Sequence, residues 1–179
     1  MTRIFIVEPM TGNLLTAEEW KNQAEDVKSA FEVVIVPGDG SQAFLITKKT
    51  ICKAPWKEAR KAAQKFKVTT KGEVVHEGFD LPTRKQWIDI REARACGLEQ
   101  VLKLIGGDKL VEDLHHEWFW TSEVWVMAGT SAEDYEKEKE RANGAWFSFG
   151  SIGCCVNGNV YGGLLALPLL LYNFREANL

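Results

Sequence analysis

The stretch Gly78–Trp87, GFDLPTRKQW, gives the clearest structural signal in this sequence of 179 residues. Thr83, followed three residues later by Gln86, forms the capping-box pattern that starts many helices. From Trp87 onward, apolar residues recur every three or four positions, which is typical of the buried face of a helix. The pattern predicts a helix from Thr83 to Gly106-Gly107, with core-facing residues Trp87, Ile90, Ala93, Gly97, Val101 and Leu104.

A shorter amphipathic pattern precedes this stretch, at Pro55–Phe66. Its apolar residues fall on one face of a helix and its basic residues on the other. We expect the apolar set to be buried and the basic set to be exposed. The apolar set is Trp56, Ala59, Ala63 and Phe66, and the basic set is Lys57, Arg60, Lys61 and Lys65.

Apolar, β-branched runs predict strands nearer the N-terminus, at Arg3–Val7, Phe31–Val36 and Ala43–Thr47. Thr16 is an N-cap candidate, because Glu18 and Glu19 follow it, and it predicts a helix between the first two strands. An Asp-Gly pair in the sequence PGDG at 37–40 predicts a hairpin turn between the second and third. The first forty-odd residues are therefore expected to form a strand–helix–strand unit.

Two aromatic runs predict strands in the second half of the chain, at Glu117–Val126 and Ala145–Phe149. The charged stretch Ser131–Ala142 between them has no apolar stripe, so we expect it to be solvated. The predicted core joins these strands to the two helices through Trp56, Phe66, Trp87, Ile90, Val101, Trp120 and Trp146.

Residues 147–174 have a composition unlike the rest of the chain, with no Lys, Arg, Asp, Glu, Gln, Met or Trp. Two interpretations are open. One is a pair of buried terminal strands joined by the turn Asn157-Gly158-Asn159, because central strands are apolar on both faces. The other is targeted diversification of Asn-type codons at their first two bases, because all the residue types present have codons that end in a pyrimidine.

No pattern in the chain points to catalysis or metal binding. Cys52, Cys96 and the pair Cys154-Cys155 match no CxxC or zinc spacing, so we expect reduced and mostly buried thiols. His115 and His116 are adjacent, so their side chains diverge. We therefore expect a protein that is not an enzyme and that has no metal and no cofactor.

Length, charge and hydropathy narrow the class of protein further. The chain is long enough for one domain with a small addition. Its net charge of −3 shows no basic excess, so we expect no nucleic-acid partner. The N-terminus lacks the apolar run of a signal peptide, and no run reaches the ~20 apolar residues of a membrane span. We expect no membrane span and a cytoplasmic location at synthesis, with association with a virion left open.

Several motifs, in chain order, resemble the C-type-lectin-like domains of bacterial and phage surface proteins. These include the variable ligand-binding proteins of diversity-generating retroelements. The match runs from about Ala43 to Phe174, and Leu167 stands where the family usually carries Arg. The matching residues are Trp56, Glu58, Ala59, Gly78, Leu81-Pro82-Thr83, Trp87, Phe119-Trp120-Thr121-Ser122, Ala145-Trp146-Phe147, Gly158-Asn159-Val160 and Ala166-Leu167-Pro168-Leu169.

The resemblance implies an α+β fold, with a C-type-lectin-like domain at 42–179 in which two helices pack on a twisted antiparallel sheet. Residues 1–41 are then a small strand–helix–strand appendage. It implies a phage or prophage receptor-binding protein that binds a protein or glycan through late loops, and a homo-oligomer is left open. The alternative is a small structural subunit whose apolar C-terminal segment mediates assembly. The implied ligand-binding residues are Ser151, Ile152, Cys154, Cys155, Asn157, Asn159 and Tyr161.

Overall fold

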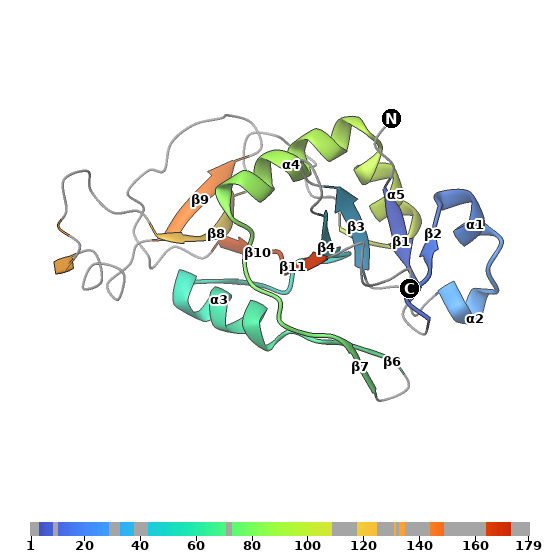
Figure 1. Cartoon of the computed structure of the whole chain (residues 1–179), viewed down its shortest axis with the longest axis horizontal. Helices are drawn as coiled ribbons and strands as arrows, with labels where there is room; N and C mark the ends of the chain where they lie inside the picture. The colour runs from blue at the N-terminus through green and yellow to red at the C-terminus, as the bar shows by residue number, and fades with distance from the viewer. Residues whose placement is uncertain are drawn as a thin grey trace.

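A computed structural model shows an α+β architecture in which helices pack on mainly antiparallel sheets (Figure 1). It describes residues 4–8, 11–28, 33–37, 43–70, 73–108, 118–124, 131, 133–134, 144–148 and 164–172. The helices are α1 (Ala17–Lys21), α2 (Glu25–Lys28), α3 (Trp56–Lys65), α4 (Arg84–Ala95) and α5 (Leu98–Leu104). The strands are β1 (Phe5–Val7), β2 (Leu14–Leu15), β3 (Val33–Pro37), β4 (Ala43–Thr47), β5 (Cys52–Ala54), β6 (Val68–Thr70), β7 (Glu73–His76), β8 (Trp118–Val124), β9 (Gly144–Ser148), β10 (Leu164–Ala166) and β11 (Leu169–Tyr172).

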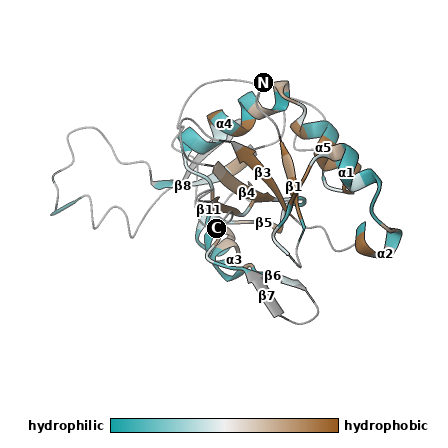
Figure 2. Ribbon diagram, turned by 45° about the vertical axis from the view of Figure 1, so that its right-hand side comes forward, coloured by the Kyte–Doolittle hydropathy of each residue, from teal (hydrophilic) through white to brown (hydrophobic). Residues whose placement is uncertain are grey.

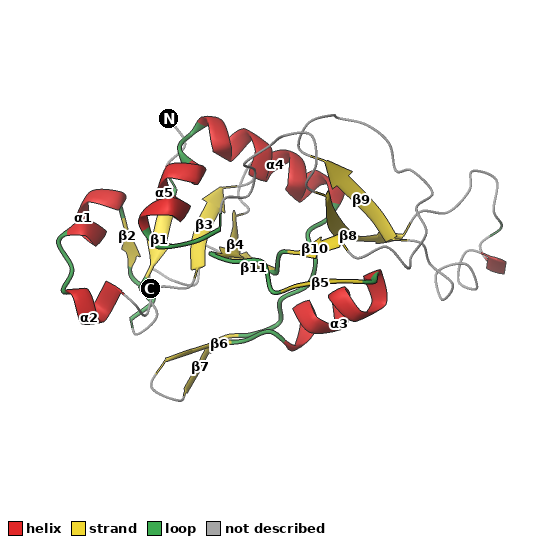
Figure 3. Cartoon of the chain, turned by 180° about the vertical axis from the view of Figure 1, so that it is seen from behind, coloured by secondary structure: helices red, strands yellow, loops and turns green. Residues whose placement is uncertain are grey.

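The described strands form two larger sheets and one hairpin. A five-stranded sheet has the order β11-β4-β3-β1-β2, a four-stranded sheet has the order β5-β10-β8-β9, and β6 pairs with β7. Every pairing is antiparallel except that of β10 with β8, which is parallel. Helices α1 and α2 lie beyond β2, at the far end of the molecule from β9 (Figure 3).

A two-stranded ribbon links the two larger sheets. β4 pairs with β11 in the first sheet, and β5 pairs with β10 in the second. Between these pairs, the Thr47 N–H donates to the Pro168 carbonyl at 3.4 Å and the Ile51 N–H donates to the Ala166 carbonyl at 3.0 Å. The two chain segments therefore stay together across the junction, and we call them the linking ribbon (residues 43–54 with 164–172).

Helices and the β6–β7 hairpin cover the two faces of this sheet system. α4 and α5 pack on one face and share a cluster that includes Ile6, Val34, Trp87, Phe119 and Leu167. On the other face, α3 covers the four-stranded sheet and the hairpin region covers the five-stranded sheet. The most hydrophobic strands are β1, β3 and β4, which lie in the middle (Figure 2).

The N-terminal strands are part of the same sheet as Ala43–Thr47. The expected division between residues 41 and 42 lies between β3 and β4, which pair with each other from Val33–Thr47 to Pro37–Ala43. Ile6 and Val34 also share one hydrophobic cluster with Trp87 of α4. The described residues on the two sides of this division are thus continuous in both sheet and core.

The predicted helix start at Thr83 is confirmed, but the predicted length is wrong. The Thr83 hydroxyl accepts from the Gln86 N–H, and the Gln86 side chain accepts from the Thr83 N–H. The helix ends at Ala95, because Gly97 has a φ of 99°, a left-handed conformation that interrupts the helix and begins α5. Gly97 is therefore a break between two helices rather than a core-facing position in one.

The predicted strands and the predicted helix at Pro55–Phe66 agree closely with the structure. Ala43–Thr47 is β4, and α3 spans Trp56–Lys65 against the expected Pro55–Phe66. Thr16 caps α1, as predicted, although a second short helix, α2, follows it. The β6–β7 hairpin at 68–76 was not predicted as paired strands.

Six of the seven predicted core residues can be placed. Trp56, Trp87, Ile90, Val101 and Trp120 are buried, and Phe66 is half-buried with its ring edge-on to Phe79. The side chain of Trp146 lies outside the described part, as does most of the charged stretch 131–142; Ser131, Glu133 and Asp134 are exposed. The aromatic core predicted from spacing is confirmed for the residues that can be placed.

Candidate functional site

The four-stranded sheet brings both ends of residues 149–163, the candidate ligand segment, to one end of β8. Ser148 of β9 lies opposite Trp118, and Leu165 of β10 lies opposite Phe119. β9 therefore ends, and β10 begins, on either side of the start of β8. Since adjacent strands lie ~4.8 Å apart, these two strands are about 10 Å apart across β8. The candidate ligand segment leaves and rejoins the sheet at this one place.

All seven predicted ligand-binding residues fall in the candidate ligand segment, outside the described residues. They are Ser151, Ile152, Cys154, Cys155, Asn157, Asn159 and Tyr161. The structure does place the strands on either side of this segment, β9 and β10. Within the described part of the uncharged stretch, Ala166, Leu167 and Leu169 are buried in β10, β11 and the link between them.

A loop at residues 77–83 ties the two sheets together next to β11. Asp80 and Leu169 exchange both backbone hydrogen bonds, at 2.9 and 2.8 Å, which fixes the loop to β11. The Ser122 N–H donates to the Pro82 carbonyl at 2.9 Å, which fixes the loop to β8. Gly78 has a φ of 85°, so its lack of a side chain permits the turn that begins this loop.

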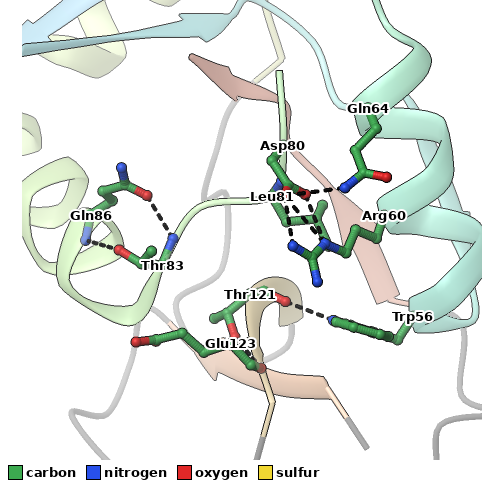
Figure 4. A network of polar contacts seen from close by, with 9 residues as sticks. All are labelled: Trp56, Arg60, Gln64, Asp80, Leu81, Thr83, Gln86, Thr121 and Glu123. Atoms are coloured by element: carbon green, nitrogen blue, oxygen red, sulfur yellow. Dashed lines mark hydrogen bonds and ion pairs between the residues drawn. The ribbon is translucent and has the colours of Figure 1, made fainter. Parts of the chain in front are cut away.

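An ion pair joins this loop to α3 (Figure 4). Arg60 contacts the Asp80 carboxylate through Nε at 3.1 Å and Nη2 at 2.8 Å, and Gln64 Nε2 adds a contact at 3.3 Å. The same carboxylate accepts from the Leu81 N–H at 2.8 Å. The Arg60 guanidinium also lies 5.4 Å from the centre of the Trp56 ring. A two-point contact of this kind between a guanidinium and a carboxylate fixes the relative orientation of the two groups as well as their separation.

Three tryptophan side chains each donate a hydrogen bond to a backbone carbonyl on another segment. Trp56 Nε1 donates to Thr121 O at 2.7 Å, and Trp120 Nε1 donates to Ala54 O at 2.7 Å. Trp87 Nε1 donates to Trp120 O at 3.4 Å. We call this cluster, with the Arg60–Asp80 pair, the tryptophan corner. It locks α3, α4 and β5 onto β8.

The first turn of α4 is bound to β8 as well. The Arg84 N–H donates to Glu123 Oε2 at 2.7 Å, in addition to the reciprocal Thr83–Gln86 cap. A carboxylate at the N-terminus of a helix is favoured by the free N–H groups and the helix dipole. The geometry of the corner is therefore set by directional contacts at every element that meets it.

The described residues contain no group of three or more His, Cys, Asp or Glu side chains that could hold a metal ion. Burial, and secondarily the Glu58 carboxylate, raise the pKa of the Cys52 thiol, which keeps it protonated and weakly nucleophilic. Burial lowers the pKa of His76, which keeps its imidazole neutral near pH 7. His115, His116, Cys154 and Cys155 lie outside the described residues.

Arg60 and Asp80 were missed as partners by the sequence patterns. Arg60 was assigned to the exposed face of its helix, but its side chain is only 31% exposed because it lies over Trp56 and against Asp80. The signal available was spacing: Arg60 follows Trp56 by four residues, and such residues share one helix face. Asp80 directly precedes Leu81-Pro82-Thr83 and lies in the same loop, residues 77–83.

The chain was compared with models of protein families, with curated proteins and with solved structures, and none of them matches. Within the part of the chain that the structure describes, no helix is both long and apolar enough to cross a bilayer.

Proposed function

We propose that this chain is a non-enzymatic ligand-binding protein with a C-type-lectin-like fold, of the variable receptor-binding type found in phages and prophages. In this proposal, residues 149–163 form the surface that contacts a protein or glycan ligand. The observation that carries it is that β9 and β10, the strands on either side of this segment, flank the same end of β8. A rigid sheet with one variable connection at its edge is how binding loops are commonly presented.

The resemblance is supported by where its residues meet. Trp56 donates to the Thr121 carbonyl, Ser122 donates to the Pro82 carbonyl, and Leu81 shares a hydrophobic cluster with Trp56 and Trp120. Leu169 is bonded to Asp80, which directly precedes Leu81. Leu167, which replaces the family's usual Arg, is fully buried in an apolar cluster that includes Trp87 and Ile6.

Replacing residues 151–161 with a Gly-Ser sequence of equal length tests whether this segment is displayed. If it is, the melting temperature changes by only a few degrees, and a ligand found on glycan or protein arrays is bound by the parent chain and not by the replacement. The control is Leu167→Ala, in the buried half of the same uncharged stretch, which we expect to cost about 2–5 kcal/mol. A replacement that unfolds the protein as severely as this control would refute display.

The gene provides a second test that needs no ligand. A variable protein of this class requires a reverse transcriptase encoded nearby and a near-copy of the 3′ end of the gene. The differences between the two copies should fall at adenines of Asn-type codons in residues 147–174. A gene without such a neighbour and repeat would rule out the retroelement part of the proposal, while leaving ligand binding to the array experiment.

One observation favours the alternative function, assembly through the C-terminal strands. β11 lies at an edge of the five-stranded sheet, and its Leu171 side chain is 58% exposed. An apolar edge strand is a known site of pairing between copies. If the subunits assemble this way, Leu171→Lys converts an oligomer measured by light scattering into a monomer. A parent chain that is already monomeric rejects this alternative.

A further inference from the structure

Residues 48–70 form a basic region in a chain whose net charge is −3. They contain a single acidic residue, Glu58. The basic residues lie on α3 or on the segments that flank this helix, and they are Lys48, Lys49, Lys53, Lys57, Arg60, Lys61, Lys65 and Lys67. The helix α3 therefore carries a local positive charge that the net charge of the chain does not show.

Three of these lysines form one exposed row along α3, which we call the lysine row. Lys57, Lys61 and Lys65 are four residues apart, so they lie along one side of the helix over about 12 Å. All three are exposed, whereas the buried residues of the helix pack on the sheet from its opposite side. Lys61 and Lys65 make no ion pair with any residue that the structure describes. The charges of these two lysines are therefore open to a partner.

The helix that carries the lysine row is fixed to the rest of the fold at two points. Trp56 Nε1 donates to the Thr121 carbonyl at 2.7 Å, which anchors the first turn of α3 to β8. Arg60 pairs with Asp80 at 2.8 Å, which anchors the next turn to the loop at residues 77–83. A backbone that is already held in place does not have to be ordered when a partner binds, and this lowers the cost of binding.

We propose that the outer face of α3 is a docking surface for a partner protein, and that the lysine row binds a helix of this partner whose carboxylates recur at every fourth residue. Every α-helix rises about 1.5 Å per residue, so charges four residues apart recur at the same interval of about 6 Å on both helices. Complementary charges of this kind orient a partner and select it against others. The inference goes beyond the proposed function and does not depend on it.

A glutamate beside the lysine row favours a protein over a nucleic acid as the partner. Glu58 is exposed, and it follows Lys57 directly and precedes Lys61 by three residues, so it borders the row. Duplex DNA carries one negative charge about every 1.7 Å along its axis, so a phosphate would lie close to the Glu58 carboxylate and be repelled by it. A protein surface carries charges of both signs and can place an amide or a basic side chain opposite this glutamate.

Single strands and membranes also fit this face less well. Single-stranded nucleic acids bind where bases stack on exposed aromatic rings, but of the aromatic residues at the two ends of α3, Trp56 is buried and Phe66 packs against Phe79. An amphipathic helix that binds a membrane inserts its apolar side, and the apolar side of α3 is already buried against Trp120 and Ala166. An acidic helix of a partner protein needs neither feature.

The test measures the fluorescence anisotropy of a labelled acidic peptide mixed with the full chain at low salt. The peptide is an alanine-based helix with a glutamate at every fourth position. Its isomer has the same composition, but its glutamates are spread around the helix, and circular dichroism checks that both peptides are helical. We expect the chain to bind the first peptide at least about threefold more tightly, because only this peptide can face all the lysines of the row at once. A chain that binds neither peptide, or binds both equally, would overturn the proposal.

Lysine variants test whether the row is the surface that binds. Lys61→Gln with Lys65→Gln should weaken binding of the first peptide about fivefold, because each exposed ion pair contributes little and two are removed. The matched control, Lys21→Gln with Lys103→Gln, removes the same charge from the last turns of α1 and α5 and should change affinity less than about twofold. All four lysines are exposed, so both variants should keep the melting temperature of the parent. Equal losses of affinity in the two variants would refute the assignment to α3.

Other anions test the choice of partner. The probes are a heparin fragment and an oligothymidylate, each with the same net charge as the peptide, and vesicles that contain phosphatidylserine. Because Glu58 repels closely spaced anions, we expect Glu58→Gln to strengthen binding of heparin and oligothymidylate more than binding of the peptide. If one of the three probes binds more tightly than the peptide and loses affinity in the Lys61→Gln, Lys65→Gln variant, the partner is a polysaccharide, a nucleic acid or a membrane, and the assignment to a protein is wrong.

Discussion

The five-stranded sheet and the tryptophan corner are both buried, but they are held together in different ways. The central strands of the sheet bury aliphatic side chains on both faces, such as Val34 and Ile35 on β3. The corner instead buries the indoles of Trp56, Trp87 and Trp120, and each indole N–H donates a hydrogen bond to a backbone carbonyl. Apolar burial scales with area and has no direction, whereas a hydrogen bond fixes orientation. The sheet is therefore stabilised mainly by non-directional apolar burial, whereas the hydrogen bonds of the corner also fix how its elements are oriented.

Truncating Trp120 should have the largest effect on stability. Trp120→Ala removes a fully buried ring and its hydrogen bond to the Ala54 carbonyl, at a cost of about 3–5 kcal/mol in the free energy of unfolding. Trp120→Phe retains most of the apolar volume, so its cost of about 1–3 kcal/mol reports mainly the lost hydrogen bond. Ile35→Val in the sheet should cost only about 0.5–1.5 kcal/mol. Denaturant titration measures all three, and a Trp120→Phe variant as stable as the parent would remove the distinction between the two regions.

A clash at the end of α5 should have the next largest effect. A Cβ at Gly107 would lie 2.5 Å from the Lys48 carbonyl oxygen, which is backbone of the linking ribbon and cannot easily move. We expect Gly107→Ala to cost about 1–3 kcal/mol. Gly106→Ala is the control, because it meets no atom within 4 Å and carries only the strain of its φ of 74°. A Gly107→Ala variant more stable than Gly106→Ala by calorimetry would contradict this contact.

Breaking the Arg60–Asp80 pair should have a smaller effect. Their side chains are 31% and 34% exposed, so solvent screens part of the attraction. A double-mutant cycle with Arg60→Met and Asp80→Asn should give a coupling of about 1 kcal/mol. Arg60→Lys tests whether the two-point geometry of the pair matters, since lysine keeps the charge but cannot make the two-point contact. If Arg60→Lys is as stable as the parent, charge alone holds the loop.

The smallest expected effect is that of pH on His76, at the end of β7. Its pKa in the folded state is below 6.5 because of burial, so the unfolded chain binds more protons as the pH falls below about 6.5. The contribution of the neutral imidazole to stability is therefore present above this pH and is lost on acidification. Denaturant titrations between pH 7 and 5.5 should show a steeper loss for the parent than for His76→Gln. Parallel curves would show that His76 does not titrate differently on folding.

Local features of the fold could be predicted from residue spacing, and non-local ones could not. The Thr83–Gln86 cap depends on four consecutive residues, so it was predicted correctly. The break at Gly97 was missed because a glycine at a three-to-four spacing is tolerated in a helix, and nothing nearby shows that its φ is positive. The order of strands in each sheet depends on pairings between distant segments, and the periodicity of apolar residues within one segment carries no information about them.

The candidate ligand segment was chosen from the sequence, and its role in binding stays a prediction, whereas the contacts beside it could not be predicted. Residues 147–174 differ in composition, so the segment could be singled out from the sequence alone. The Arg60–Asp80 pair depends on where α3 lies relative to the loop at residues 77–83, which the spacing of residues along one helix does not reveal.

The linking ribbon also constrains when the fold can be completed during synthesis. β4 and β5 are made early, but their partners β11 and β10 leave the ribosome over a hundred residues later. Until then, each sheet exposes an unpaired apolar edge and the tryptophan corner lacks the Leu169 contacts that anchor its loop. Pairings of such long sequence separation fold slowly, because a large loop must close first. The nascent chain therefore remains open to mispairing until its final strands emerge, and a truncation before Leu164 would remove one strand from each sheet at once.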